Sequence, residues 1–385
     1  MKTLLSLSLS LLFALSLVSP RPVSAAQLQT LPVDRAGGVL IYGAYGYSGK
    51  GISRLAAEYG ITPVLSGRNG EKLKAIADEL GYDYITLSLD DNHARLVEVL
   101  RGFELVMHIA GPYTYTSKPM LDAAVEAGTH YVDLTGENHV IQAELDRHQE
   151  FVDAGIMVMP AVGYDVVPTD CLNLHVAGKV EDPTELIMIM NGEYTSAEGT
   201  PASRGTIKSA LEMLSLPLLM RQDGQMIEVE QPKVITREFN GQERTMVQIP
   251  WADMITSWVS TGIPTIEVYQ VQTGEIPGWV PWLAQRSWGK SLLIWLIDEF
   301  FPEGPTEEAQ ATRQTQLVAT VTNARGESAS AEMITPEPYL LTFHSSLMIA
   351  KRILAGQWQP GFQTPAKMYG SKLALEIPGV SLRDL

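Results

Sequence analysis

The stretch VLIYGAYGYSGKGISRLAAEYG, from Val39 to Gly60, decides how the first part of the chain folds. Its opening residues, Val39–Tyr42, are apolar or aromatic and predict a buried strand. Residues Ser48–Tyr59 carry apolar or small side chains at helical spacing, so a helix is expected there. The turn between strand and helix holds three glycines at three-residue spacing, which are Gly43, Gly46 and Gly49.

A strand-to-helix turn of this kind can hold a phosphate group. Gly43 permits the tight turn, Gly46 lets the backbone approach a pyrophosphate closely, and Gly49 lets the helix pack on the strand. The free N–H groups of the helix then face the anion. The spacing G-x-x-G-x-x-G differs from the usual G-x-G-x-x-G, and glycine turns also occur for packing reasons alone. The surrounding sequence has to decide between the two interpretations.

Strand-like and helix-like segments alternate for more than a hundred residues after Gly37. Six strands with crossover helices predict a doubly wound parallel sheet, a Rossmann domain, over residues 37–165 of an α/β protein. Ligands of such sheets bind outside the carboxyl ends of the strands. The expected strands are Val39–Tyr42, Thr62–Leu65, Asp83–Thr86, Leu105–Ile109, His130–Asp133 and Ile156–Met159, and the expected later helices are Lys72–Leu80, Asn92–Leu100, Ser117–Ala127 and Ile141–Ala154.

The pattern changes after Pro160 to alternating, β-rich segments. They predict an α+β domain over residues 166–334, for substrate binding or dimerisation, with a mainly antiparallel sheet. Helices are expected at Gly205–Leu216 and, within a C-terminal part (335–385) that can pack back on the Rossmann domain, at Tyr339–Leu354. The expected strands are Glu185–Asn191, Met226–Val229, Lys233–Phe239, Thr265–Val271 and a hairpin of Gln316–Thr322 with Ser328–Ile334.

Composition narrows the classes of protein to which the chain can belong. It has 385 residues and a net charge of -16, without the clusters of Lys and Arg that contact phosphates, so no nucleic-acid partner is expected. Cys171 is the only cysteine, which excludes an internal disulfide and a cysteine-based metal site. The seven histidines lack H-x-x-x-H spacing, and no other metal site is expected.

The first residues, MKTLLSLSLSLLFALSLVSPRPVSAAQ, predict a signal peptide over residues 1–25. An apolar run at Leu4–Val18 precedes the small residues Val23-Ser24-Ala25, which suit a cleavage site. Export to the periplasm or out of the cell is therefore expected. The alternative is an uncleaved membrane anchor formed by residues 4–18, although a spanning helix needs about 20 residues.

The segment from Ile276 to Phe301 is apolar and holds four of the seven tryptophans. Its helical part, Ser287–Phe301, is too short and too charged to span a bilayer. Two interpretations stay open. One is a helix of the core or of a dimer interface, and the other is a surface that docks on a membrane or admits a lipid chain.

Arg68 follows the second predicted strand, in the sequence Ser66-Gly67-Arg68-Asn69. A site selective for NAD usually places Asp or Glu there for the ribose 2′-hydroxyl, whereas an arginine can pair with the 2′-phosphate of NADP. The position therefore favours NADP, and the alternative is a solvated turn residue.

Eight stretches, spread over nearly the whole chain after residue 37, carry a family resemblance. They are GAYGYSG, SGRN, HIAGPY, AAVEAGTHYVDLTGE, VGYDVVPTD, STGIPTIEVY, TPEPYLLTF and GFQTPAKMYG. They resemble the saccharopine dehydrogenase-like oxidoreductases, which include the trans-acting enoyl reductases. The resemblance implies an NADP-binding Rossmann domain, a second domain that closes over the nicotinamide, and a homodimer. Tyr45 departs from the small or hydroxyl residue that this family more often has before the second glycine.

The residues expected to bind NADP or NADPH lie in the loops after the first, second and fourth strands. They are Gly43, Tyr45, Gly46, Tyr47, Ser48, Gly49, Ser66, Arg68, Asn69, Ala110, Gly111 and Pro112.

A hydride transfer also needs a donor for the proton that follows. The candidates at strand ends are Tyr113, Asp165, and Asp133 or Glu137, and burial in a closed cleft would raise the pKa values of the carboxyl groups. Each has a structural alternative, because the aspartates can cap turns or helices and Tyr113 can pack on the cofactor.

Other reaction classes lack their motifs: the chain has no Y-x-x-x-K pair, no P-loop and no G-x-S-x-G elbow. We therefore expect an NADP-dependent oxidoreductase that transfers a hydride to or from a C=C, C=N or C=O bond of a small, lipid-like molecule. The alternative is a Rossmann-derived protein that binds a nucleotide or a lipid without catalysis. Export favours this alternative, because NADP is scarce outside the cytoplasm.

Overall fold

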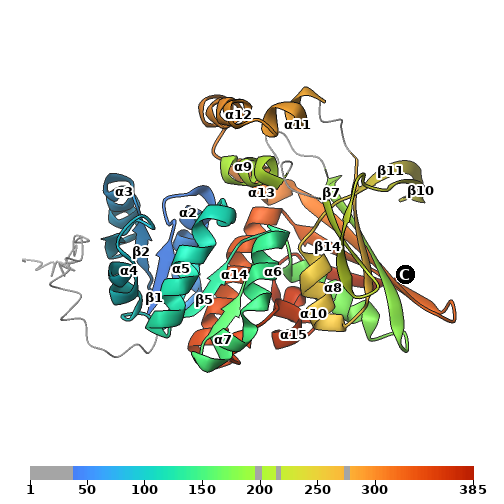
Figure 1. The fold of residues 1–385 in the computed structure, drawn as a ribbon, viewed down its shortest axis with the longest axis horizontal. Helices are drawn as coiled ribbons and strands as arrows, with labels where there is room; N and C mark the ends of the chain where they lie inside the picture. Colours follow the sequence, from blue (N-terminus) through green and yellow to red (C-terminus); the bar gives the residue numbers. More distant parts are fainter. Residues whose placement is uncertain (1–37, 196–201, 214–217, 273–277) are drawn as a thin grey trace, which may run out of the picture.

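The computed structural model describes residues 38–195, 202–213, 218–272 and 278–385, which form two sheets with helices around and between them (Figure 1). The first sheet is formed by the early part of the chain together with one short strand from the red C-terminal part, and the other later strands form the second sheet. Residues 1–37 lie outside the described residues, so the signal peptide at 1–25 and the anchor at 4–18 stay predictions.

The first sheet is parallel throughout, in the order β15-β6-β5-β4-β1-β2-β3. This confirms the predicted Rossmann sheet. The sequence pattern indicated six strands, and the structure adds β15, a two-residue strand from the C-terminal part that is too short to carry a periodicity. The strands are β1 (Val39–Tyr42), β2 (Val64–Gly67), β3 (Tyr84–Thr86), β4 (Leu105–His108), β5 (His130–Asp133), β6 (Met157–Met159) and β15 (Gly361–Phe362).

Helices cover both faces of this sheet, so its strands are apolar on both sides. In β1, Val39 and Ile41 belong to one hydrophobic cluster, while Leu40 and Tyr42 belong to the cluster on the opposite face. The predicted helix at 141–154 is two helices, α6 and α7, which meet at Arg147. The helices are α2 (Tyr47–Leu55), η1 (Ala56–Tyr59), α3 (Gly70–Leu80), α4 (His93–Leu100), α5 (Tyr113–Ala127), α6 (Asn138–Asp146) and α7 (His148–Asp153).

The second sheet is mixed and mainly antiparallel, in the order β10-β11-β12-β7-β13-β14-β16, with the hairpin β8-β9 attached to β12. The pair β7-β12 is parallel and the other pairs are antiparallel, as predicted for most of the sheet. The sequence pattern missed β8, β11 and β16; in β11 the first three residues, 242–244, are polar and exposed and give no apolar signal. The strands are β7 (Pro183–Thr195), β8 (Leu218–Gln222), β9 (Gln225–Val229), β10 (Val234–Phe239), β11 (Gln242–Gln248), β12 (Thr265–Val271), β13 (Gln314–Asn323), β14 (Ser328–Pro336) and β16 (Ser381–Asp384).

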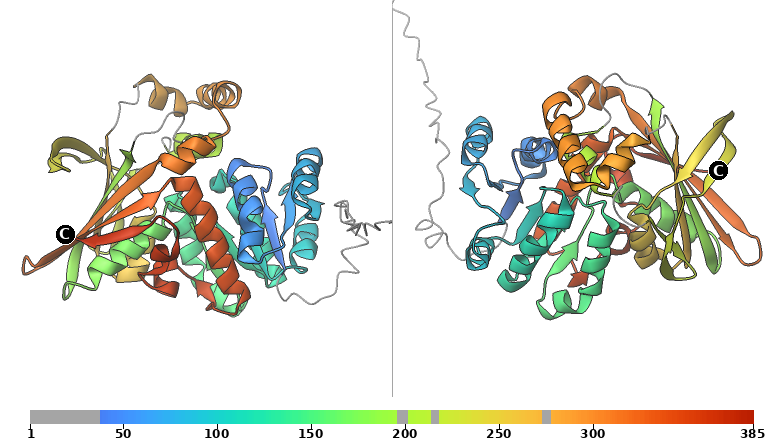
Figure 2. Two further views of the ribbon diagram at one scale, coloured as in Figure 1. Left: turned by 180° about the vertical axis from the view of Figure 1, so that it is seen from behind. Right: turned by 45° about the horizontal axis from the view of Figure 1, so that its top comes forward.

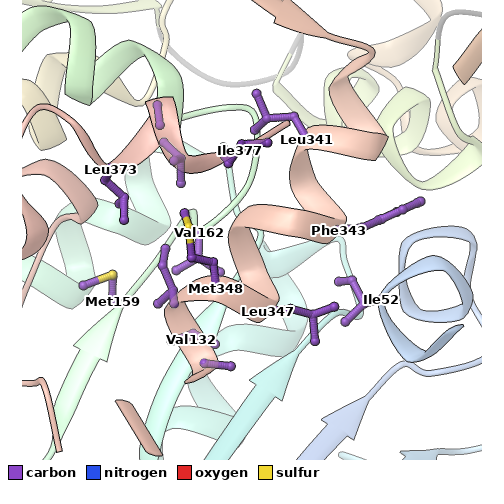
Figure 3. Packing of buried hydrophobic residues seen from close by; sticks show 14 of the residues in the cluster. Ile52, Val132, Met159, Val162, Leu341, Phe343, Leu347, Met348, Leu373 and Ile377 are labelled. Atoms are coloured by element: carbon purple, nitrogen blue, oxygen red, sulfur yellow. The ribbon is translucent and has the colours of Figure 1, made fainter. Parts of the chain in front are cut away.

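The long C-terminal helix α14 (Pro338–Leu354) lies between the two sheets and joins their cores (Figure 2). Figure 3 shows Leu347 beside Ile52 of α2, and Met348 beside Val162. The ring of Phe343 occupies the space where a Cβ atom on Gly51 would lie, so α2 and α14 pack closely. The remaining helices are α8 (Val167–Ala177), α9 (Arg204–Met213), α10 (Asp253–Thr261), α11 (Trp279–Ala284), α12 (Ser287–Phe300), α13 (Glu307–Thr312), α15 (Pro365–Tyr369) and η2 (Leu373–Glu376).

Two buried carboxyl groups, Asp170 on α8 and Asp253 on α10, lie under the second sheet. Asp253 accepts hydrogen bonds from Asn173 (2.9 Å) and Ser257 (3.1 Å) through one oxygen, and Asp170 accepts one from the amide of Ala366 (2.9 Å). The second oxygen of each carboxyl has no partner among the described residues. Burial, together with the charge of Asp170, raises the pKa of Asp253 to about 8, so the folded protein favours the protonated acid.

We expect Asp253→Asn to stabilise the protein at alkaline pH. A carboxyl whose pKa is raised on folding contributes full stability below its unfolded pKa of 3.8, and that stability is lost as the pH rises through about 8. Asparagine cannot ionise, so the variant avoids this loss. Urea unfolding should show a gain of about 2 kcal/mol near pH 9 and little change near pH 5. The shift of the pKa from 3.8 to about 8 sets an upper limit of about 6 kcal/mol for this gain. Asp83→Asn on the surface is the control, and equal destabilisation of Asp253→Asn at both pH values would contradict the assignment.

Candidate cofactor and active site

The glycine turn after β1 is closely packed at two of its three glycines. A Cβ atom on Gly43 would lie 2.6 Å from the carbonyl oxygen of Ile109, and the φ of Gly43 is 90°. A Cβ atom on Gly49 would overlap the carbonyl oxygen of Gly43, so α2 lies directly against the turn. On Gly46 a Cβ atom would meet only the Gly43 carbonyl oxygen, at 3.3 Å, and the rest of the space above this residue is open within 4 Å.

The first turn of α2 presents backbone donors at the carboxyl end of β1. The amide of Gly46 donates to Gly43 and that of Lys50 donates to Gly46, whereas the amides of Tyr47, Ser48 and Gly49 have no acceptor among the described residues. Three free amides at a helix N-terminus bind an anion, and the open space above Gly46 admits one. The turn therefore fits the pyrophosphate of a dinucleotide, at the point between β1 and β4 where the strand order reverses.

The end of β2 holds two cationic side chains. The Arg68 guanidinium is exposed and has no hydrogen bond or ion pair with a described residue. Lys72, which the sequence analysis did not single out, lies with its Nζ 5.9 Å from the centre of the Tyr45 ring. The Tyr45 ring covers Gly67, because a Cβ atom there would lie 2.7 Å from it. This arrangement suits a phosphate on the adenosine ribose.

Two of the predicted cofactor residues hold this region in place through their own contacts. The Ser66 hydroxyl is buried and donates to the Ile85 carbonyl (3.0 Å), while the Ser66 carbonyl accepts from the amides of Gly43 and Ala44. The Asn69 side chain caps α3 by accepting from the amide of Lys72 (3.0 Å).

The Tyr47 side chain points away from the glycine turn. Its hydroxyl donates to the Pro305 carbonyl (2.7 Å) and accepts from Gln310 (2.6 Å), and its ring packs edge-on against Tyr339 of α14. Only the backbone amide of Tyr47 faces the phosphate position. The side chain ties α2 to the segment that follows α12.

The loop Ala110-Gly111-Pro112 after β4 leads directly into α5, and a buried carboxylate holds its end. Glu137 accepts from the amides of Tyr113 (2.9 Å) and Thr114 (2.7 Å) at the start of this helix. It also accepts from the hydroxyls of Thr114 (2.5 Å) and of Ser209 on α9 (3.1 Å). A carboxylate at a helix N-terminus is favourable, and here it also fastens α9 over the loop.

Besides Glu137, the candidate proton donors Tyr113, Asp133 and Asp165 have different surroundings. Tyr113 is buried, and its hydroxyl donates to the His108 carbonyl (3.3 Å); burial, with the charge of Asp133 next, raises its pKa well above 10. Asp133 is fully buried and accepts from Tyr131 and from the amides of Thr135 and Ala161, each at 2.9 Å. The Tyr113 hydroxyl and the Asp133 carboxyl are therefore both used in hydrogen bonds within the fold.

Asp165 differs from the other two candidates. Its carboxyl accepts no hydrogen bond from the described residues, and burial raises its pKa to about 6. An Asp165 carboxylate oxygen would lie 2.7 Å from a Cβ atom on Gly136, which places it against the loop that follows β5. The residue is half-buried, so this carboxyl is the one of the three that can exchange a proton with a ligand.

The start of α14 completes the wall of the site. The Tyr339 hydroxyl accepts from the amide of Ser203 (2.6 Å) and hydrogen-bonds with Thr206 (2.6 Å), while Glu337 caps α14. Both Tyr339 and Glu337 belong to the stretch TPEPYLLTF, which in the sequence carries only a family resemblance. Their position opposite the Rossmann loops depends on tertiary packing and has no periodic signal. In the described ranges no group of three or more His, Cys, Asp or Glu side chains could hold a metal ion.

Comparison with known proteins identifies the first domain. Residues 39–159 match the family model of the saccharopine dehydrogenase NADP binding domain. These residues are a saccharopine dehydrogenase NADP-binding domain. The glycine turn, the free amides of α2 and the loop after β4 all lie within this range, so this domain carries a nicotinamide-cofactor site.

Curated relatives match the same part of the chain. A trans-acting enoyl reductase of Mycobacterium tuberculosis strain H37Rv is 33% identical over 151 residues, which cover 37% of this chain and 36% of that protein. A putative trans-acting enoyl reductase of the same strain is 30% identical over 193 residues, or 46% of this chain and 44% of that protein. The chain thus matches less than half the length of either relative.

A solved structure extends the likeness in fold to the second domain. The apo saccharopine dehydrogenase (L-Glu forming) from Saccharomyces cerevisiae superposes with a TM-score of 0.60 over 91% of this chain and 100% of that chain. The two sequences are 13% identical, so this likeness shows a shared fold.

Proposed function

We propose that the protein is an NADP-dependent oxidoreductase. The observation that carries the proposal is the pair of anion positions at the carboxyl edge of the parallel sheet: the free amides of α2 for the pyrophosphate, and the free Arg68 guanidinium for the 2′-phosphate. The family of the first domain and the names of the two mycobacterial relatives support it.

The residues around the loop after β4 would orient the reacting ends of cofactor and substrate. When bound, NADPH supplies the hydride. Glu137 and Ser209 hold α9 over Gly111, which limits the access of water to this loop. Asp165 holds the proton on its half-buried carboxyl and delivers it to the reduced substrate.

The reaction we propose is the reduction of the C=C bond of an enoyl group, because both named relatives are called enoyl reductases. We propose a hydrophobic substrate, because apolar and aromatic helices, α11 and α12, cover α9 at the edge of the site. Turnover of NADPH with a medium-chain enoyl thioester separates this proposal from non-catalytic nucleotide or lipid binding. The homodimer and export stay predictions.

We expect Arg68→Ala to weaken NADPH binding by about tenfold or more and to leave NADH binding unchanged. The guanidinium has no other described partner, so its loss should affect only the contact with the 2′-phosphate. NADPH and NADH fluorescence titrations of the full chain measure both affinities.

Arg101→Ala, at an exposed arginine after α4, is the control for a general loss of positive charge. Equal weakening of NADPH and NADH by Arg68→Ala would contradict the proposed 2′-phosphate contact. The whole proposal would be contradicted if the unaltered protein bound neither nucleotide at about 1 mM.

A further inference from the structure

The helices α11 and α12 expose an unusual amount of aromatic surface. Trp279, Trp282, Trp288 and Trp295 are 57%, 50%, 61% and 55% exposed. Tryptophan side chains are usually largely buried, so this exposure is unusual. It rules out the interpretation that these helices belong to the core of the chain. The other exposed apolar side chains of this surface, which we call the aromatic face, are Leu292, Phe300 and Phe301.

The aromatic face is one side of an amphipathic arrangement. Gly289, Leu293 and Ile297, four residues apart, are buried against α9 and α11. Trp288, Leu292 and Trp295, at the spacing i, i+4, i+7, form the opposite stripe. In Figure 2 the two orange helices lie at the outer surface of the molecule, beyond α9.

Two of the three charged side chains of α12 contact α9, and the third, Glu299, is exposed. Lys290 pairs with Glu212 (2.6 Å) and Asp298 pairs with Lys208 (2.5 Å). Arg286, just before α12, stacks on Trp282, with its guanidinium carbon 3.7 Å from the ring centre. The outward stripe therefore has few charges with which a protein partner could form a complementary polar rim.

The rings of the aromatic face are arranged in edge-on pairs. Trp282 and Trp288 have centroids 6.3 Å apart, and Trp295 and Phe300 have centroids 6.0 Å apart. Tryptophan combines a large apolar body with one N–H donor, which suits the boundary between lipid headgroups and acyl chains. In the described ranges no helix is long and apolar enough to cross a membrane, so contact through these helices would be superficial.

Two further features of the chain favour a lipid surface over a second copy. The apolar run Leu4–Val18 is expected to bring the chain to a membrane, whether as a signal peptide or as an anchor. The net charge of -16 opposes binding to anionic lipids, which points to zwitterionic headgroups.

We propose that the aromatic face docks on the surface of a zwitterionic phospholipid bilayer. This rests on the proposed function in one respect, since the same helices cover the edge of the cofactor site. Ser209 of α9 contacts Glu137, and Glu212 of α9 accepts from Tyr115 (3.2 Å) and Lys290. Docking would thus hold the site next to the bilayer, where a hydrophobic substrate would accumulate.

Flotation with phosphatidylcholine vesicles tests the proposal. The unaltered protein should float with the vesicles and its tryptophan emission should shift to shorter wavelength. The triple variant Trp288→Ser, Leu292→Ser, Trp295→Ser should lose about tenfold or more of the bound fraction, because it removes exposed apolar area without touching the buried stripe.

The double variant Val234→Ser, Leu375→Ser is the matched control, because it removes exposed apolar side chains elsewhere and should float like the unaltered protein. NADPH binding without vesicles should be unchanged in the triple variant, which keeps this test separate from the proposed function. Absence of flotation by the unaltered protein would overturn the proposal. So would a dimer, seen by light scattering, that the triple variant dissociates while vesicle binding stays absent.

Discussion

Gly46→Ala should abolish most NADPH binding in a protein that still folds, whereas Gly49→Ala should impair folding itself. At Gly46 the backbone has a φ of -72°, which any residue adopts, and an added methyl group meets only the Gly43 carbonyl oxygen, at 3.3 Å. That methyl group would occupy the space left for the pyrophosphate. We expect the dissociation constant of NADPH to rise about a hundredfold, with a small change in melting temperature.

At Gly49 the added methyl group would overlap the Gly43 carbonyl oxygen and press α2 away from β1. Overpacking of this kind costs about 3 kcal/mol, which urea unfolding can measure. Gly178→Ala, at an ordinary φ of -70° after α8, is the control and should change neither property. Unaltered NADPH affinity in Gly46→Ala would place the cofactor elsewhere.

The sequence predicted the parallel sheet well because its signals are local. Each strand is a short apolar run, and each crossover helix repeats its apolar residues at helical spacing, so six of the seven strands could be placed. The strand β15 is two residues long, and its pairing with β6 depends on where α14 directs the chain. Nothing in a two-residue segment can specify that.

The sequence could indicate only those parts of the candidate site that lie in the loops after the parallel strands. The glycine turn and Arg68 follow from spacing along the chain, because the loops after adjacent parallel strands meet at one edge. The role of Glu137 depends on α9, which comes from the second domain and brings Ser209 to the carboxylate. Tyr47 shows the opposite case. It follows Gly46 directly, yet its hydroxyl forms hydrogen bonds with Pro305 and Gln310, which are distant in the sequence.

Asp165→Asn should lower turnover by about a hundredfold while leaving NADPH affinity unchanged. Loss of a positioned proton donor costs about this much. The unaltered protein should lose activity as the pH rises through about 6, because the raised pKa keeps the carboxyl protonated below that value and a carboxylate has no proton to give. In the variant this dependence should disappear. The measurement is NADPH oxidation with a medium-chain enoyl thioester across this pH range.

Asp133→Asn separates proton donation from structural support. Asp133 accepts three hydrogen bonds that hold the end of β5 to the segment before α8, so its replacement should reduce stability and leave the pH dependence of turnover in place. Gly136 is relevant to the role of Asp165, because a side chain at position 136 would collide with the Asp165 carboxyl and displace it. If Asp165→Asn retained full turnover and the same decline above pH 6, the proton would have to come from another group or from water. The lack of a hydrogen-bond partner for the Asp165 carboxyl among the described residues would then need a different explanation.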